Sequence, residues 1–260
     1  GQMSYWGAQV IISLFGAIPY IGESLELWVR GDYYISGITV SRFFALHVVA
    51  LPLVLIALVF LHLVALHEVG AGNPEGVDIE KYLDEDGVPL DSVPFYPYKV
   101  LNGLVAIGIF MTVFSIIMFF FPEGGGYFIE MANFQEANPL VTPDHIAPVW
   151  YYAPFYTMLR AIPDPLGGLI VMAAAVAIFF IVPWLDRSKV ASIRYKGIYS
   201  KIAITMFGVS FLTLGYLGTV GVTEVRKTMS VICTVIYFAF FLLMPIYTKY
   251  EKTGIVPERL

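Results

Sequence analysis

Five long apolar runs alternate along the chain with connections that are polar or rich in glycine and proline. The first run, Phe43 to Leu66, carries no charged side chain except two histidines. At a rise of about 1.5 Å per residue, such a run crosses a hydrocarbon core as one helix. Four further spans are expected at Val100–Phe121, Leu166–Leu185, Ile202–Val222 and Met229–Tyr247. The pattern therefore predicts an all-α, polytopic membrane protein.

The connections differ in character. Residues 4–21 are apolar but interrupted by Gly7, Gly16 and Pro19, which favours a short helix lying at the membrane interface. Residues 68–98 hold eight of the twenty acidic side chains and are expected to form a solvated loop. Residues 122–164 are rich in glycine, proline and aromatic side chains, and a connection of this length is usually functional.

Composition supports the membrane class and excludes others. Apolar residues make up 58% of the chain and charged residues 13%, and the mean hydropathy is +0.76. The net charge of -5, without a large basic patch, argues against a nucleic-acid partner. The single cysteine, Cys233, excludes an intrachain disulfide and any iron–sulfur cluster built from this chain alone. No basic segment opens the chain, so no cleavable signal peptide is expected.

Lysine and arginine are distributed unevenly between the two sides that five spans define. Residues 68–99, 186–201 and those after 248 share one side, and they carry twice as many basic residues as the other. The positive-inside rule places this side, including the C-terminus, in the cytoplasm. His47 then lies near the outer surface and His62 near the inner one.

Two histidines within a membrane span are the strongest candidates for chemistry. At about 100° and 1.5 Å per residue, His47 and His62 return to within about 60° of one another and lie about 22 Å apart. An imidazole has one lone-pair nitrogen that suits iron, so the pair could ligate two separate metal centres. The alternative is that both only hydrogen-bond to neighbouring helices.

Several motifs occur in order along the whole chain: GQMSYWGA, AIPYIG, RFFALH, LHLVALHE, ANPLVTPDHIAPVWYY and LRAIPDPLGG. They resemble cytochrome b of the ubiquinol:cytochrome c oxidoreductase, the bc1 complex, in its bacterial form. The resemblance implies the C-terminal two-thirds of that subunit, with transmembrane helices D to H. Residues 1–68 would be the end of the N-terminal cytochrome b region, and residues 69–260 the C-terminal region.

The resemblance implies two b-type haems. His47 would ligate the low-potential haem near the outer face and His62 the high-potential haem near the inner face, each with a partner histidine from an earlier helix. Because both axial positions are filled, such haems carry electrons and do not bind oxygen. Arg42 resembles the arginine beside a haem propionate; the alternative is an arginine that reaches the interface.

An outer quinol site is also implied, framed by the GQMSYWGA segment and the PVWY loop. Its residues would be Met3, Gly7, Pro148, Val149, Trp150, Tyr151 and Tyr156. A flat quinol needs an apolar slot walled by aromatic rings, and Gly7 would let the ring approach the backbone.

Val149 stands where the family usually has a glutamate, so no carboxylate at that position can accept a quinol proton. His145 is the first candidate in its place, because an ordinary imidazole pKa of about 6.5 suits proton transfer near neutral pH. Its alternative role is a structural hydrogen bond. The other candidates are Asp144, Glu136 and Glu130.

An inner quinone site is implied at His67, just past the first span, where the alternative is an interfacial histidine. The family's lysine–aspartate pair near the start of the next helix aligns with Asn102 and Gly103, which leaves proton uptake there unassigned. Weak candidates for that role are Asp91, Glu68 and Lys99.

The histidine spacing departs from the mitochondrial form by one residue and is similar to that of the photosynthetic b6f relative. One additional residue rotates the second ligand by about 100° unless a π-bulge absorbs it. Pro52 already interrupts the hydrogen-bond ladder, so a π-bulge is expected near it.

The function implied by the resemblance is quinol oxidation in a Q-cycle, in a bacterial plasma membrane. The implied partners are a Rieske iron–sulfur protein, cytochrome c1, ubiquinol and ubiquinone, and a second copy of cytochrome b. One alternative is a b6f-like subunit, but there the haem-bearing span and the later spans are separate polypeptides. The other is a non-redox transporter, which the lack of intramembrane acids disfavours.

Overall fold

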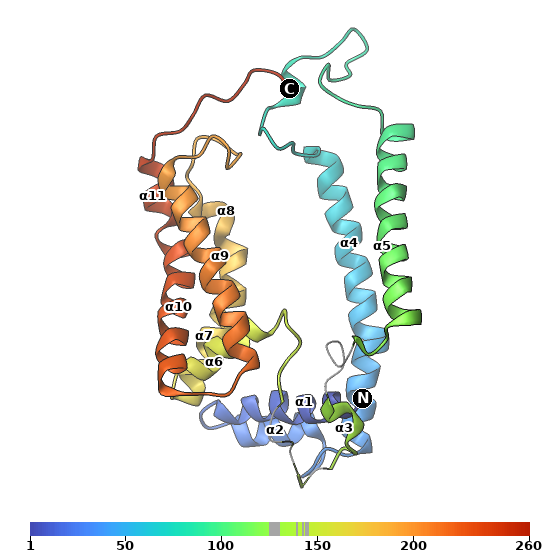
Figure 1. Ribbon diagram of the computed structural model, residues 1–260, viewed down its shortest axis with the longest axis vertical. Helices are drawn as coiled ribbons and strands as arrows, with labels where there is room; N and C mark the ends of the chain where they lie inside the picture. Colours follow the sequence, from blue (N-terminus) through green and yellow to red (C-terminus); the bar gives the residue numbers. More distant parts are fainter. Residues whose placement is uncertain (125–130, 139, 142, 144–145) are drawn as a thin grey trace. The chain divides into compact units, whose positions relative to one another are not determined.

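The computed structural model describes residues 1–124, 131–138, 140–141, 143 and 146–260, and the chain in it forms two compact units. The first contains residues 3–72 and 137–255, with Gly1. The second contains residues 73–136 and 256–260, with Gln2. Within the described residues, the regular structure is helical, and strand pairing is limited to two isolated bridges (Figure 1). The predicted all-α class is confirmed.

Five helices are long and apolar enough to cross a membrane among the described residues. They are Gly37–Val69, Phe95–Phe120, Pro165–Leu185, Ile198–Thr219 and Glu224–Leu242. Each overlaps a span expected from the sequence. The last one differs at both ends, because the Thr223 side chain caps the helix at Arg226 N–H, and Pro245 starts a new helix, α11 (Met244–Tyr250).

The first span is not a uniform α-helix. It consists of α3 (Gly37–Ala45), the π-helical turn η2 (Leu46–Ala50) and α4 (Leu51–Val69). Pro52 follows directly in the first turn of α4, where its missing N–H leaves the α-helical ladder incomplete. The predicted π-bulge near Pro52 is confirmed.

The remaining helices of the first unit precede or follow this span. Before it lie α1 (Gln2–Ser13), η1 (Leu14–Ala17) and α2 (Gly22–Arg30). After it come α6 (Ala153–Ala161), α7 (Pro165–Ala177), η7 (Ile178–Ile181), α8 (Val182–Leu185), α9 (Ile198–Thr219), α10 (Glu224–Leu242) and α11. Short helices are therefore present at the start, and their position at a membrane interface stays a prediction.

The core of the first unit lies where α6, α7, α9 and α10 pack together (Figure 1). Tyr237 and Leu214 are fully buried there, with Met158 and Phe241 against them. The Tyr237 hydroxyl donates a hydrogen bond to the carbonyl oxygen of Ala175 at 2.8 Å, which satisfies the one polar atom of that ring. The core therefore ties α10 to α7 by a directional bond as well as by apolar contact.

Two glycines let α6 approach its neighbours. A Cβ at Gly218 on α9 would lie 2.4 Å from the carbonyl oxygen of Ala153, and a Cβ at Gly168 on α7 would lie 2.4 Å from that of Leu159. Real side chains do not tolerate such contacts. The short helix α6 is therefore held closely between two membrane spans.

The start of α9 is capped by a buried carboxylate from a distant part of the chain. The Ser200 N–H and hydroxyl donate hydrogen bonds to Glu251 Oε2 and Oε1 at 3.1 and 2.7 Å. Ser200 is in the first turn of α9, where N–H groups lack intrahelical acceptors and the helix dipole favours an anion. Glu251 therefore joins the end of α11 to the start of α9.

Replacing Glu251 by alanine removes both bonds and leaves buried donors unsatisfied. We expect Glu251→Ala to lower the free energy of unfolding by about 1–3 kcal/mol, visible as a lower melting temperature in detergent. Glu251→Gln, which keeps one acceptor oxygen, should lose less. Exposed Glu258→Ala is the matched control. Equal melting temperatures for Glu251→Ala and Glu258→Ala would contradict this role.

The second unit combines one apolar helix with the acidic loop. Its helix α5 (Val100–Phe120) follows the π-helical turn η4 (Phe95–Lys99), and the loop contains the short 3-10 helix η3 (Ile79–Lys81). Among the described residues of this unit, the remaining element is η6 (Met131–Phe134). Arg259 makes a two-pronged contact with Asp91, at 3.2 Å from Nε and 3.0 Å from Nη2. This pair fastens residues 256–260 to the loop.

The Arg259 guanidinium lowers the pKa of Asp91 below its ordinary value. The folded state therefore favours the charged carboxylate, so the contact is complete at neutral pH and is lost as pH falls below the ordinary aspartate pKa of about 4. We expect a spin label at Glu258→Cys, in a Cys233→Ser background, to stay immobilised at pH 5 and to become mobile in stronger acid. Mobility that does not depend on pH, or that rises at pH 7, would count against the tether.

Candidate functional site

The two candidate metal-ligating histidines lie on one continuous helical rod. His47 is within η2 and His62 within α4, and both side chains are exposed. Neither imidazole hydrogen-bonds to a residue that the structure describes. Because the π-helical turn absorbs one residue, their spacing acts as fourteen α-helical steps. The imidazoles then lie within about 40° of one another and about 21 Å apart along the rod.

These side chains fit the chemistry of two haems held between imidazoles. Each offers a free imidazole on an apolar, exposed helix face, beside neighbours such as Leu51 and Leu58. Among the described residues, no three histidine, cysteine or acidic side chains gather as a metal site. His47 and His62 are therefore not part of a three-ligand cluster within the described residues.

Arg42 has a structural role that the sequence did not indicate. Its Nη1 donates a hydrogen bond to the carbonyl oxygen of Trp28 at 2.5 Å, near the end of α2. Gly31, with a φ of 78°, ends that helix, and a Cβ there would lie 2.6 Å from the same nitrogen. Arg42 therefore caps α2 and fixes the turn before the haem-bearing rod. Its predicted contact with a propionate stays a prediction.

The segment with Met3 and Gly7 forms α1. An ideal Cβ at Gly7 would meet no heavy atom within 4 Å, so the space beside that backbone is open, as a ring-approach site requires. Trp6, which sequence reasoning passed over, is buried, and its Nε1 donates to the carbonyl oxygen of Val141 at 3.1 Å. Thus Trp6 joins α1 to the chain that leads into the PVWY segment.

The PVWY segment is a turn that leads into α6. The Val149 carbonyl accepts hydrogen bonds from the N–H groups of Tyr152 and Ala153, at 2.9 and 3.2 Å. The rings of Trp150 and Tyr151 meet edge to face with centroids 5.5 Å apart, and the Trp150 side chain is 81% exposed. The turn therefore presents two adjoining aromatic rings outward.

Tyr156 lies on α6, one turn beyond the PVWY residues, and Arg160 covers its ring at 4.3 Å from the centroid. The buried Thr157 hydroxyl makes short contacts to the carbonyls of Leu214 and Ala153, at 2.7 and 3.0 Å. Since a hydroxyl donates one hydrogen, these contacts share it. Neither Thr157 nor Arg160 was identified from the sequence. The sequence signals this close packing only through the small residues of the neighbouring helices.

The structure describes only one of the four predicted proton acceptors. His145, Asp144 and Glu130 lie outside them, and Glu136 is exposed in the second unit. The role of His145 stays a prediction.

At the predicted inner site, His67 is exposed in the last turn of α4, beside Glu68. Asp91, one of the weak candidates for proton uptake, is engaged by Arg259, and its lowered pKa disfavours proton binding at neutral pH. Lys99 ends η4 in the second unit.

Comparison with known proteins gives a consistent result. The family model described as "Cytochrome b(N-terminal)/b6/petB" matches residues 1–154, and "Cytochrome b(C-terminal)/b6/petD" matches residues 136–238. The chain is 52% identical to cytochrome b of Allochromatium vinosum and 41% identical to that of Rhodospirillum rubrum. These alignments cover 100% and 99% of the chain, but 64% and 61% of the relatives, so the chain spans under two-thirds of their length.

A solved structure titled "Hyperthermophilic respiratory Complex III" is similar to this fold, with a TM-score of 0.85 and 33% identity. The match covers 96% of this chain and 64% of that one. The helical order described above is therefore shared with a chain of a respiratory membrane complex.

Proposed function

Since this chain belongs to the cytochrome b family, we propose that it is part of the membrane subunit of a quinol:cytochrome c oxidoreductase. Two b-type haems would be held by His47 and His62, each with a second imidazole from another segment. Haem supplies reversible one-electron transfer when it is bound. The observation that carries the proposal is the alignment of these two imidazoles along one apolar rod by η2.

The outer quinol site would lie at α1 and the PVWY turn. The open space beside Gly7 admits a flat ring, and Trp150 and Tyr151 offer aromatic walls. Trp6 and Thr157 keep the two segments in place through hydrogen bonds to Val141 and Leu214. Quinol bound there would be oxidised, and an iron–sulfur partner and a haem held by His47 would supply the two one-electron acceptors.

Haem held by His62 would supply one-electron transfer toward the inner side, where His67 would contact a quinone. Release of protons outside and uptake inside would move charge across a bacterial plasma membrane, with residues after 248 in the cytoplasm. The partners we propose are a Rieske iron–sulfur protein, cytochrome c1 and a second copy of cytochrome b, with ubiquinone as the carrier. We therefore propose that the assembled complex has quinol:cytochrome c reductase activity.

Substitution of either histidine in the full complex tests the haem assignment. We expect His47→Ala and His62→Ala each to remove one of two b haems, because one imidazole alone holds haem weakly. His67→Ala, on the same helix but outside the proposed pair, should retain both. Redox titration of the reduced haem band in purified membranes separates the two centres. Full haem content in His47→Ala or His62→Ala would exclude the altered residue as a ligand.

The role of η2 generates a separate prediction. Deletion of Val49 removes the residue that the π-helical turn absorbs, so the ladder becomes α-helical and the imidazoles keep their relative direction. We expect both haems to remain. Insertion of alanine after Leu58 adds one residue to a regular α-helix and rotates His62 by about 100°. That variant should lose the haem at His62. If only the Val49 deletion lost a haem, the proposed role of η2 would be wrong.

A further inference from the structure

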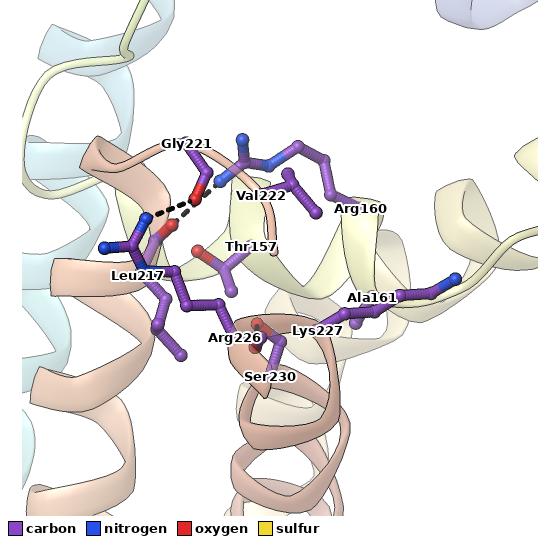
Figure 2. A pocket seen from close by; sticks show the side chains of 9 residues that line it. All are labelled: Thr157, Arg160, Ala161, Leu217, Gly221, Val222, Arg226, Lys227 and Ser230. Carbon is purple, nitrogen blue, oxygen red and sulfur yellow. Dashed lines mark hydrogen bonds between the residues drawn. The ribbon is translucent and has the colours of Figure 1, made fainter. Parts of the chain in front are cut away.

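A small hollow lies where the end of α6 meets the connection between α9 and α10. Figure 2 shows its lining, which includes Thr157, Arg160, Leu217, Gly221, Arg226 and Ser230. The inner space is about 20 Å³, enough for one or two water-sized groups at about 10–15 Å³ each. A hollow of this size can hold one or two oxygen atoms of a ligand, while the rest of the ligand stays outside.

Two guanidinium groups converge on the hollow from different helices (Figure 2). Arg160 Nη2 donates to the carbonyl of Leu217 at 2.9 Å, and Arg226 Nη1 donates to that of Gly221 at 2.8 Å. A guanidinium carries five N–H donors, so these bonds satisfy only part of each group. Arg160 Nε is buried and has no hydrogen-bond partner among the described residues.

The charge around the hollow is positive. In the part of the chain that the structure describes, no ion pair joins Arg160, Arg226 or Lys227 to a carboxylate. Arg226 and Lys227 also occupy the first turn of α10, where the helix dipole disfavours cations and favours an anion. Glu224 in the same turn offsets one of these charges. Lys227 extends away from the two guanidiniums in Figure 2, so it contributes charge rather than a contact.

The hollow is placed at an end of two membrane spans, since α9 ends at Thr219 and α10 begins at Glu224. The apolar side chain of Val222, which lines the hollow, is exposed, and the same two spans carry exposed apolar side chains at Leu212 on α9 and Val225 on α10. Exposed Tyr216 on α9 suits the headgroup level. A molecule with an anionic head and apolar chains matches this arrangement, whereas a free ion would leave the apolar flanks unused.

We propose that this hollow binds the phosphate of an anionic phospholipid, with Arg160 and Arg226 donating to its oxygens. A phosphate oxygen can enter the hollow while the remainder of the head stays at its mouth. A zwitterionic lipid carries an ammonium group that Arg226 and Lys227 would repel. The ligand is therefore a phosphodiester lipid without a compensating cation. Its site does not include His47 or His62, and it adjoins the proposed quinol site through the contact of Arg160 with the Tyr156 ring.

The test uses the full complex in nanodiscs of phosphatidylcholine, titrated with phosphatidylglycerol, with bound lipid counted by native mass spectrometry. We expect Arg226→Gln to weaken phosphatidylglycerol retention by about five- to tenfold, as loss of one interfacial cation predicts. Arg226→Lys should recover part of the effect. Lys249→Gln, which removes an exposed cation in the last turn of α11, is the matched control and should change nothing.

Three results would overturn the proposal. Equal retention of phosphatidylglycerol and phosphatidylcholine by the unaltered complex would remove the charge preference. Unchanged retention in Arg226→Gln, with an unchanged melting temperature, would move the lipid elsewhere. Full displacement of phosphatidylglycerol by millimolar inorganic phosphate would assign the site to a free anion. Reduced haem spectra recorded on the same samples keep this result separate from the assignment of His47 and His62.

Discussion

The directional alignment of two imidazoles on one helix is the constraint on which the rest of this structure depends. In a regular α-helix His62 would lie about 60° to one side of His47, and with one residue absorbed by η2 it lies about 40° to the other side. The π-helical turn widens the hydrogen-bond ladder for one step, beside Pro52, which lacks the N–H that would complete it. The local irregularity therefore sets the direction of His62 in the proposed electron path.

The second requirement is a rigid frame for the aromatic turn at Trp150 and Tyr151. That frame comes from close packing: α6 approaches α9 and α7 because Gly218 and Gly168 have no side chain in the way. Once the helices are this near, the Thr157 hydroxyl reaches a carbonyl of α9. Loops that carry binding residues are usually mobile, and this one is anchored at its end by a helix fixed on two spans.

Sequence reasoning predicted the spans and the π-turn because each depends on local chemistry. Apolar runs define membrane helices, and a proline with one additional residue between two ligands indicates a widened turn. The last span was expected to continue to Tyr247, but Pro245 starts a new helix before that point. Long-range bonds, such as Trp6 to Val141 and Ser200 to Glu251, have no local signature. The role of Arg42 as a cap on α2 was missed for the same reason.

The measurement that tests the central claim most directly is a structure of the assembled complex with its haem bound. The account predicts one iron porphyrin coordinated by a ring nitrogen of His47, another coordinated by His62, and an imidazole from a different segment opposite each. Imidazoles at these two positions that contact only protein or lipid would contradict it.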